Sequence, residues 1–474
     1  MFSAYTQKLK QFIVYLLGSI FLYCAMAPVY SNLSSYFHYK LGIIISAIIF
    51  PLVMLIVIYI ANKNFKKLAS VFYKLPQKIT IIHVILFALL IRVIWIILVD
   101  NSNVHPDNLD LRAKALFDSG KLLKFSLEKP MGTPIITAIQ YFIFGYNRFS
   151  GLFLQVIASL LEIYLVYTIL KKTISSRAGL VAAIVLSIHP ESVFFSNLIF
   201  SDTFFSVLVL SIFYILFFFD KLWVYILTGF LAAISYYIRP VIILPLVIIF
   251  PFILYKSLKN RYTTNFTIKL FLFVSIFVIV MIPQIKFNYE ATKSISISTS
   301  KQLGLSLAFA TSPYHFARCN NRDVAEINKI ITKNKESINM FSKDKYGKRL
   351  AFERFKEKPL SLILKSILIK PYLLWGNPGA AQACVGGVKN GILKKLLLGI
   401  SLVFNKFILI FSGLVLLKNI LIRKNNFILL LVSYALLVTA SQLFLECQPR
   451  YSHMFIPLQC MLIGMISQYK RINN

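Results

Sequence analysis

The sequence predicts an all-α polytopic membrane protein: a bundle of about 12 transmembrane helices with outer juxtamembrane helices and a large extracytoplasmic loop region. Hydrophobic residues make up 58% of the 474 residues, and charged residues make up only 14%. A water-soluble chain of this length would leave much of that apolar surface in water, whereas a bilayer accommodates it. Several runs of about 18–22 nearly uncharged residues have the length that a helix needs to cross the hydrocarbon core.

The apolar runs follow one another along most of the chain. The first run lacks a small-residue cleavage site and is long enough to remain as an anchor, so we expect no cleavable signal peptide. Residues 133–146 are apolar but short, which favours an interfacial or re-entrant helix. Glu162 lies inside the fourth span, where a carboxyl group is protonated, paired or functional, and the sequence leaves these alternatives open. The predicted spans are 11–30, 42–61, 79–99, 149–170, 178–199, 203–219, 222–238, 240–256, 267–286, 397–417, 427–445 and 452–468.

Basic residues predict the orientation of these spans. The formal net charge is +34, and the short segments between spans are rich in Lys and Arg. All these segments fall on one side when the spans are counted, and the positive-inside rule assigns that side to the cytoplasm. Both termini are then cytoplasmic, and the long polar regions 100–132 and 287–394 face the extracytoplasmic side. The basic segments are residues 63–67, 171–177, 256–261, 418–424 and 470–471.

The spans and polar regions divide the chain into four parts. Residues 1–78 form an N-terminal extension of two spans with a cytoplasmic loop. Residues 79–286 form the transmembrane core, which includes the first outer loop at 100–132. Residues 287–394 form the extracytoplasmic loop region, and residues 395–474 form the C-terminal transmembrane helices. We expect this multi-pass protein in a bacterial inner or cytoplasmic membrane.

The charge and the cysteines exclude some functions. No compact basic domain separates from the apolar runs, so nucleic-acid binding is not expected. The five cysteines fall in no metal-ligand spacing. Cys319 and Cys384 both lie in the largest polar region, and a disulfide between them stays an open alternative.

Ionisable and polar groups gather where the predicted spans reach the outer face. Asp107 and Asp110 follow the span that ends at residue 99, so they emerge where lipid gives way to water. Charged groups at lipid depth are costly and mark functional sites by default. The other members of the group are Asp202 between the fifth and sixth spans, Arg239 at the end of the seventh, and Glu446, Arg450 and Tyr451 between the last two.

Each of these residues also has a structural explanation. Asp107 and Asp202 could cap the helices that follow them, and Arg239 and Arg450 could anchor helix ends at lipid headgroups. Their common depth favours a functional site instead. A carboxylate can take the proton of an attacking hydroxyl, and the planar guanidinium group matches the oxygens of a phosphate. The set therefore suits transfer of a sugar from a lipid-linked phosphate to an acceptor on the water side.

Short motifs in a defined order extend this interpretation over residues 80–470. They are Asp107 with Ala113, Ala115 and Gly120; Pro130-Met131-Gly132-Thr133-Pro134; Phe144-Gly145; Ser201-Asp202; Tyr237-Ile238-Arg239-Pro240; Asn288-Tyr289 with residues 296–300; residues 352–375 with Lys358-Pro359 and Lys370; and Arg450-Tyr451 with Pro457. In this order the motifs resemble family 39-type glycosyltransferases of the GT-C superfamily. That group includes dolichyl-phosphate-mannose protein mannosyltransferases and bacterial aminoarabinose lipid A transferases. The chain departs from it at Leu111, where an aromatic residue is usual, and in the two spans before the core.

The resemblance implies a GT-C-like bundle that moves a sugar from a polyprenyl-phosphate donor to an envelope acceptor on the extracytoplasmic face. It implies that Asp107 is the catalytic carboxylate. The sugar stays open, and so does the acceptor, which is a glycan or wall polymer, a lipid or a protein. The resemblance and the common depth together place Asp110, Asp202 and Asn288 at the acceptor or sugar, and Arg239, Lys370, Arg450 and Tyr451 at the donor phosphate.

Two other functions and one cofactor remain as alternatives. A transporter or flippase of lipid-linked sugars would place its charges near the midplane and often carries paired repeats, whereas this chain shows charges at one edge and no clear repeat. A cell-wall polymer ligase or polymerase would share the donor lipid and the basic outer region. Asp107, Asp110 and Asp202 could bind a divalent cation, although no spacing requires a metal.

Overall fold

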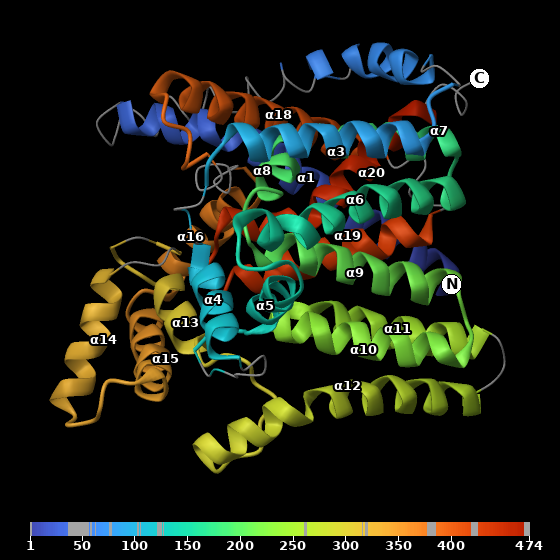
Figure 1. The fold of residues 1–474 in the computed structure, drawn as a ribbon. Coiled ribbons are helices and arrows are strands. Elements are labelled where there is room, and N and C mark those ends of the chain that lie inside the picture. Colours follow the sequence, from blue (N-terminus) through green and yellow to red (C-terminus); the bar gives the residue numbers. More distant parts are fainter. Residues whose placement is uncertain are drawn as a thin grey trace.

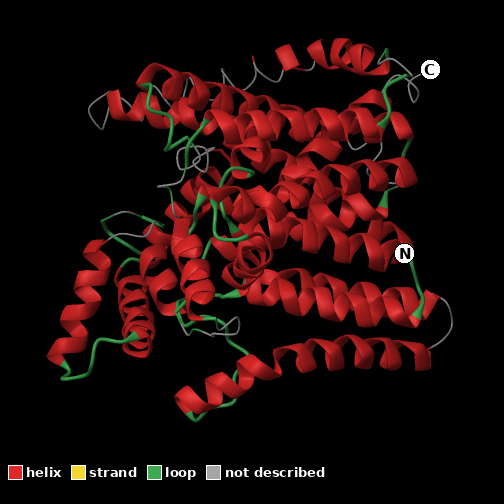
Figure 2. Cartoon of the chain, viewed as in Figure 1, coloured by secondary structure: helices red, strands yellow, loops and turns green. Residues whose placement is uncertain are grey.

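The computed structural model contains only helices and connecting loops among the residues that it describes, so the predicted all-α class is confirmed (Figure 2). The described residues are 2–36, 56, 59–61, 63–74, 78–101, 104, 106–120, 126, 128–259, 263–314, 316–317, 321–376, 385–418 and 425–468. Most of the predicted span 42–61 lies outside them, and so do Cys319 and Cys384, whose disulfide therefore stays a prediction.

Mostly long helices form a bundle, and most of the shorter helices gather at one of its ends (Figure 1). The bundle contains α1 (Phe2–Tyr36), α3 (Ile81–Leu98), α6 (Arg148–Thr173), α7 (Ser176–Ser187), α8 (Pro190–Phe195), α9 (Ser201–Phe218), α10 (Leu222–Ile238), α11 (Ile243–Lys259), α12 (Thr263–Thr292), α18 (Gly391–Lys418), α19 (Asn426–Gln442) and α20 (Ile456–Met465). The shorter helices are η1 (Pro106–Asn108), α4 (Leu109–Ser119), α5 (Gly132–Phe144), η2 (Pro240–Ile242), α13 (Leu303–Ala310), α14 (Asn321–Lys333), α15 (Met340–Glu357), α16 (Pro359–Pro371), η3 (Tyr372–Gly376), η5 (Pro449–Phe455) and η6 (Ile466–Gln468).

The lengths and surfaces of these helices fit a multi-pass membrane protein. Within the described residues, six helices are long and apolar enough to cross a membrane, and five shorter ones are also apolar. The side chains of Ile82, Leu86 and Ile97 on α3 are more than half exposed. Such a surface is stable where hydrocarbon is the solvent, because lipid satisfies apolar side chains and the helix satisfies its own backbone groups.

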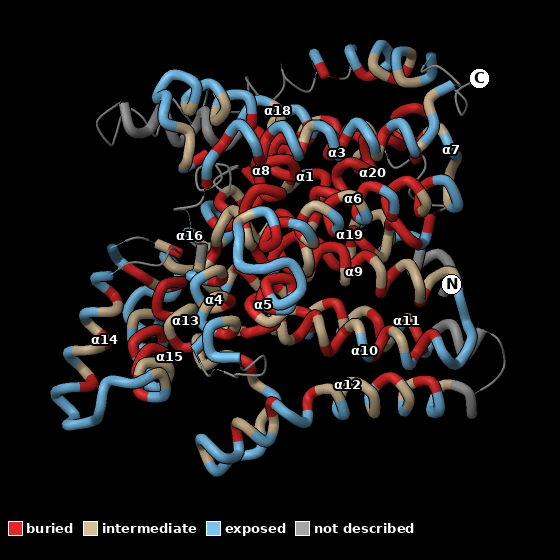
Figure 3. Tube along the Cα trace, viewed as in Figure 1, coloured by how far each residue is buried: buried red, intermediate tan, exposed pale blue. Residues whose placement is uncertain are grey.

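A single large apolar core joins the N-terminal, central and C-terminal helices (Figure 3). Helix α1 packs closely along α18, where Gly18 and Gly413 face one another. The core also encloses polar groups. Arg92 is fully buried and donates hydrogen bonds to the hydroxyls of Ser159 and Ser192. The buried Glu162 accepts a hydrogen bond from Ser206, so this carboxyl group links α6 to α9.

The predicted span 178–199 is two helices, α7 and α8, with a break at Ile188 and His189. Pro190 explains the break, because proline disfavours the helical conformation in the residue before it and provides no backbone donor. Helix α8 then ends at the buried connection from Asn197 to Phe200. The break therefore places this connection against the start of α9.

The described part of the region 287–394 is largely helical, and its helices α13, α14 and α15 lie at one end of the bundle. Helices α13, α14 and α15 gather beside α4, whereas the turn between α6 and α7 and the end of α11 lie at the opposite end (Figure 1). Helix α12 contains Pro283 and bends before the polar region begins. The predicted short helix at 133–146 is α5, which packs between α4 and α6.

Candidate active site

Asp107 lies between two cations that come from distant parts of the chain. Its Oδ1 is 2.9 Å from the Nζ of Lys129, and its Oδ2 is 2.6 Å from a terminal nitrogen of Arg450. Asn108, which directly precedes α4, makes no side-chain capping bond. The two carboxylate oxygens of Asp107 contact cations and not the backbone of α4. These contacts favour a functional role of Asp107 over helix capping.

The backbone of this turn is unusual. Asp107 has a φ of 55° and Asn108 a φ of 56°. Residues other than glycine rarely adopt this left-handed conformation, which costs about 1–3 kcal/mol each and occurs mainly where a site needs it. The turn is thus the strained element that carries the Asp107 carboxylate to the cations.

The charge of Asp107 is determined by these neighbours. Burial raises the pKa of its carboxyl group, but the positive charges and hydrogen bonds of Arg450 and Lys129 outweigh burial and lower that pKa to about 2. The carboxyl group is therefore ionised at neutral pH. It is also a weak base for as long as both cations stay beside it.

Arg239 and Asp202 form a second ion pair in the same region. A terminal nitrogen of Arg239 lies 2.6 Å from Oδ2 of Asp202, and its Nε donates to the hydroxyl of Ser201 at 3.0 Å. The side chain of Asp202 is only 2% exposed. Asp202 and Ser201 begin α9, and Arg239 ends α10, so the pair connects two helix ends and fixes the guanidinium in one orientation.

Tyr451 brings the two arginines together. The guanidinium carbons of Arg239 and Arg450 each lie 5.6 Å from the centre of its ring. The Arg450 guanidinium also lies 5.1 Å from the ring of Phe200. Aromatic faces attract cations and hold planar guanidinium groups without competing for their hydrogen bonds. Both arginines also line a cavity, together with Tyr451.

Several of these residues line a cavity of about 550 Å³, which we call the cationic cavity. Lys129, Lys343, Arg239 and Arg450 contribute positive charges to its wall, Asp107 and Glu446 contribute carboxylates, and Tyr451 contributes an aromatic face. The wall also has a large apolar part. This part includes Leu109, Ile238, Val241, Leu303, Leu305, Phe309, Leu445 and Met454. An anionic group attached to an apolar chain would meet both kinds of surface here.

Lys129 is a site residue that the sequence reasoning missed. It directly precedes the motif Pro130-Met131-Gly132, which would have drawn attention to it. The structure explains why glycine stands at 132, since a Cβ there would lie 2.6 Å from the backbone of Tyr237. The start of α5 therefore packs directly on the end of α10, at the two residues that precede Arg239. This packing brings the segment that carries Lys129 to the cationic cavity.

Four predicted site residues do not line the cationic cavity: Lys370, Asn288, Asp110 and Asp202. Lys370 is 1% exposed, and its ammonium group donates to the backbone oxygens of Leu443 and Leu445. Burial lowers its pKa to about 8. It was expected at the donor phosphate, but it satisfies carbonyl groups just after α19, because a buried ammonium needs nearby acceptors.

Asn288 has a similar structural role. It is 1% exposed, and its amide nitrogen donates to the backbone oxygens of Ser296 and Ser298. Its oxygen accepts a hydrogen bond from Gln284. Its side chain thus fastens the segment after α12 to that helix, and no group is directed to the cationic cavity.

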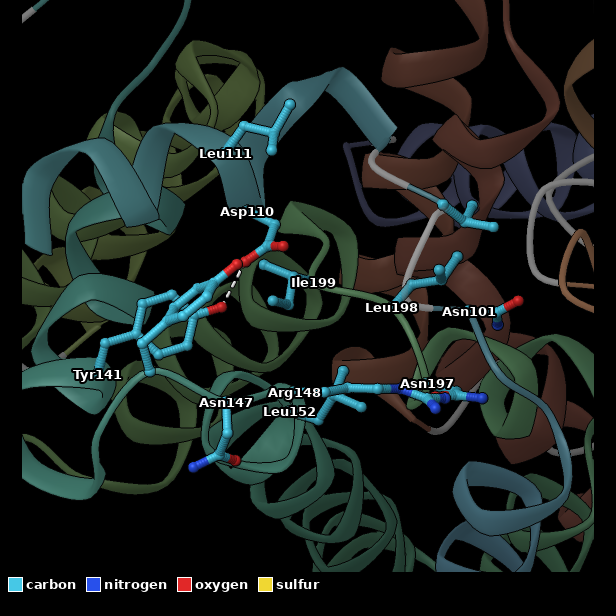
Figure 4. Close-up of a pocket in the computed structure, with 12 residues that line it drawn as sticks. Asn101, Asp110, Leu111, Tyr141, Asn147, Arg148, Leu152, Asn197, Leu198 and Ile199 are labelled. Atoms are coloured by element: carbon cyan, nitrogen blue, oxygen red, sulfur yellow. Dashed lines mark hydrogen bonds between the residues drawn. The ribbon is translucent and has the colours of Figure 1, made fainter. Parts of the chain in front are cut away.

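Asp110 lies apart from Asp107, in the wall of a second cavity of about 300 Å³. Its carboxylate accepts a hydrogen bond from the hydroxyl of Tyr141, and the two side chains point toward one another (Figure 4). Among the described residues, no group of three or more His, Cys, Asp or Glu side chains comes together as a metal site. Asp107 and Asp202 each pair with an arginine, whereas Asp110 accepts a hydrogen bond from a tyrosine.

The comparisons with known proteins agree with the resemblance seen in the motifs. Residues 128–286 match the family model described as dolichyl-phosphate-mannose-protein mannosyltransferase. The resemblance is confirmed. The matched residues include Lys129, Asp202 and Arg239, whereas Asp107 and Arg450 lie outside them. The predicted class, a membrane glycosyltransferase, is confirmed with it.

Two solved structures show a distant likeness to the chain. They are crystal structures of ArnT from Cupriavidus metallidurans, one in the apo state and one bound to undecaprenyl phosphate. The apo structure has 13% sequence identity and a TM-score of 0.35, with 81% of this chain and 77% of that chain covered. The second has 14% identity and the same TM-score, with coverages of 82% and 78%. No curated protein matches the chain. The assignment therefore rests on the family model and on the residues of the site.

Proposed function

We propose that this glycosyltransferase takes its sugar from a polyprenyl-phosphate donor and transfers it to an envelope acceptor on the extracytoplasmic face. The observation that carries the proposal is the Asp107 carboxylate, which is held between Lys129 and Arg450 in the wall of a cavity lined by several cations and by apolar side chains. The family that residues 128–286 match is described by a donor of this chemical class, a dolichyl phosphate.

The phosphate of the donor binds Arg239, Arg450 and Lys129. Arg239 is oriented by Asp202, and Arg450 lies against Phe200 and Tyr451, so both guanidinium groups meet the phosphate with little loss of side-chain entropy. Charge-assisted contacts of this kind also stabilise the negative charge that develops on the phosphate as it leaves. The apolar part of the wall, with residues such as Leu303 and Phe309, receives the first carbons of the lipid chain.

Asp107 accepts the proton of the attacking hydroxyl. The acceptor oxygen forms a bond to the anomeric carbon of the sugar, and the bond from that carbon to the phosphate oxygen breaks. The polyprenyl phosphate leaves with the electron pair, and the acceptor proton passes to Asp107. In the unliganded protein the cations lower the pKa of Asp107 to about 2. A bound phosphate shares Arg450 and Lys129, so it raises the basicity of Asp107 when the donor is in place.

The orientation of the bundle supports a site outside the cytoplasm. The basic segment between α6 and α7 lies at the end of the bundle opposite to α4 and α13–α15. By the positive-inside rule the first end is cytoplasmic, and so are both termini. The cationic cavity, which α13 helps to line, then opens on the extracytoplasmic side.

Sugar transfer by the purified protein tests the proposal. The donor is a synthetic polyprenyl phosphate that carries a radiolabelled sugar, and the acceptor is an envelope extract from a deletion strain. Asp107→Asn keeps the size of the side chain but removes the base, so we expect a loss of about 10²–10⁴-fold in rate. Asp118→Asn on α4 is the matched control, because Asp118 pairs only with Lys114 in an exposed position. A folded Asp107→Asn protein with normal activity would show that the carboxylate is structural.

A further inference from the structure

The second cavity, which contains Asp110, is bounded by residues from four parts of the chain, and we call it the polar cavity. Asn101 and Val104 come from the segment after α3, and Tyr146, Asn147 and Arg148 come from the turn between α5 and α6. Figure 4 shows the side chain of Arg148 extending toward Asn197, while Asp110 faces Tyr141. Its volume of about 300 Å³ lies at the lower end of the range for small-molecule sites. It therefore suits a small polar unit rather than a lipid chain.

Two segments of the chain contribute residues to both the polar cavity and the cationic cavity. In the turn that leads into α4, Asp107 and Leu109 line the cationic cavity, whereas Asp110 and Leu111 line the polar cavity. The connection from α8 to α9 is divided in the same way. Asn197, Leu198 and Ile199 line the polar cavity, and Ser201 lines the cationic one. A ligand in the polar cavity is therefore next to the turn that carries Asp107.

The two cavities differ in their available charge. The cationic cavity is lined by four cations, Lys129, Arg239, Lys343 and Arg450, and by two carboxylates, Asp107 and Glu446, so its charge is positive. The polar cavity contains one arginine, Arg148, but its guanidinium already pairs with Asp100 at 3.0 Å and donates to the Asn197 side chain at 2.7 Å. It also donates to backbone oxygens at the end of α3. The carboxylate of Asp110 adds a negative charge, so the polar cavity disfavours a phosphate and favours donors such as hydroxyl groups.

Aromatic rings provide the remaining surface. Tyr146 is 45% exposed, and its ring is held against Phe117 at 6.3 Å and Tyr141 at 4.9 Å between centroids. Tyr141 is 1% exposed and donates its hydroxyl proton to Asp110. A carboxylate has about four lone-pair sites, so Asp110 can accept further hydrogen bonds. Fixed aromatic faces beside a carboxylate and amides match a sugar ring, which has apolar C–H faces and hydroxyls at its edge.

Two glycines build this arrangement. Gly145 has a φ of 76°, which allows the chain to turn between α5 and α6 and brings Tyr146 to the cavity. Gly151 on α6 lies against Tyr141 and Ile199. A Cβ on Gly151 would be 2.6 Å from the Tyr141 hydroxyl and 2.8 Å from Cδ1 of Ile199. The absence of a side chain at 151 therefore lets Tyr141 reach its position beside Asp110.

We infer that the polar cavity binds a neutral, hydroxyl-bearing sugar unit of the acceptor and presents it to the turn that carries Asp107. The inference rests on the proposed function and names the acceptor class as a glycan or glycolipid. Asp110 and Tyr146 determine the preference for this acceptor. The phosphate of the donor is bound by the cationic cavity alone.

Ligand binding to the purified protein in nanodiscs tests this assignment. The probes are a panel of neutral methyl hexosides and methyl N-acetylhexosaminides, detected by saturation-transfer NMR, and a polyprenyl phosphate, detected by thermal shift. We expect Tyr146→Ala and Asp110→Asn to weaken glycoside binding by about tenfold or more, the loss of one or two polar contacts. Both variants should bind polyprenyl phosphate as the wild type does. Arg239→Ala should show the opposite pattern.

Matched controls separate this role from a general effect on folding. Tyr164→Ala removes an equally exposed tyrosine from the outer surface of α6, and Glu353→Gln removes an exposed carboxylate from α15. Both should bind glycosides normally. Glycoside binding that is lost in Arg239→Ala but kept in the Tyr146 and Asp110 variants would overturn the assignment. So would a protein that binds polyprenyl phosphate but none of the glycosides. Failure to bind polyprenyl phosphate would instead count against the proposed donor.

Discussion

Replacement of Arg450 tests the phosphate clamp most directly, because this side chain contacts both Asp107 and the cationic cavity. A charge-assisted contact to a phosphate contributes about 1.5–3 kcal/mol, or roughly 10- to 150-fold in affinity. We therefore expect Arg450→Ala to weaken the binding of a polyprenyl phosphate by an amount in this range. Arg450→Lys should rescue binding only in part, because an ammonium group lacks the planar pair of donors.

The same substitution also affects stability. A carboxyl pKa that falls from 3.8 to about 2 in the folded protein corresponds to about 2 kcal/mol of stabilisation at neutral pH. Arg450 supplies part of this, since Lys129 remains beside Asp107 in the variant. The Tm of Arg450→Ala should therefore fall, but by less than the loss of this whole free energy would cause. Donor affinity must be compared well below the Tm of each variant.

The assay is titration of a polyprenyl phosphate into purified protein in nanodiscs, with binding measured by microscale thermophoresis. Arg349→Ala is the matched control, because Arg349 is exposed on α15 and pairs there with Glu353 on the same helix. It removes the same charge without touching the cavity. Wild-type affinity in both Arg450→Ala and Arg239→Ala would refute the clamp, whatever the effect on Tm.

Three further predictions follow from the positions of single residues. Lys370→Met should lower the Tm but leave the affinity for polyprenyl phosphate unchanged, because the ammonium group of Lys370 bonds to backbone oxygens outside the cavity. Weaker donor binding by a folded variant would show that Lys370 contacts the phosphate. The Tm difference between wild type and Asp107→Asn should be constant above about pH 5. It should shrink as the pH falls below about 4 toward 2, since a carboxylate with a depressed folded-state pKa contributes stability that is lost on protonation; a difference that does not vary with pH would contradict the ion pairs. The last test labels single cysteines in a variant without native cysteines. An impermeant thiol reagent should label Lys335→Cys and not Lys171→Cys on intact cells, or on spheroplasts if there is an outer membrane. The reverse pattern would place the site in the cytoplasm.

Several features of the site could be predicted from the sequence because they depend on local pattern. Uninterrupted apolar runs specify membrane helices whatever else the chain does, since no other element satisfies the backbone in lipid. Asp107, Arg239 and Arg450 stood out because each carries a charge at the edge of such a run. The break before Pro190 did not stand out, because the apolar run continues across it and hides the change of helix.

The partners of these residues were decided by the tertiary structure. Asp107 meets Arg450 across 343 positions of sequence and Lys129 across 22, and no periodicity links them. Lys370 was expected beside the phosphate, yet burial near the end of α19 directs it to carbonyl groups. Asp107 and Asp110 are close in sequence but face different cavities, because the left-handed turn between them changes the direction of the chain. Hydropathy is a property of each segment alone, whereas the pairing of charges depends on which helix ends meet in space.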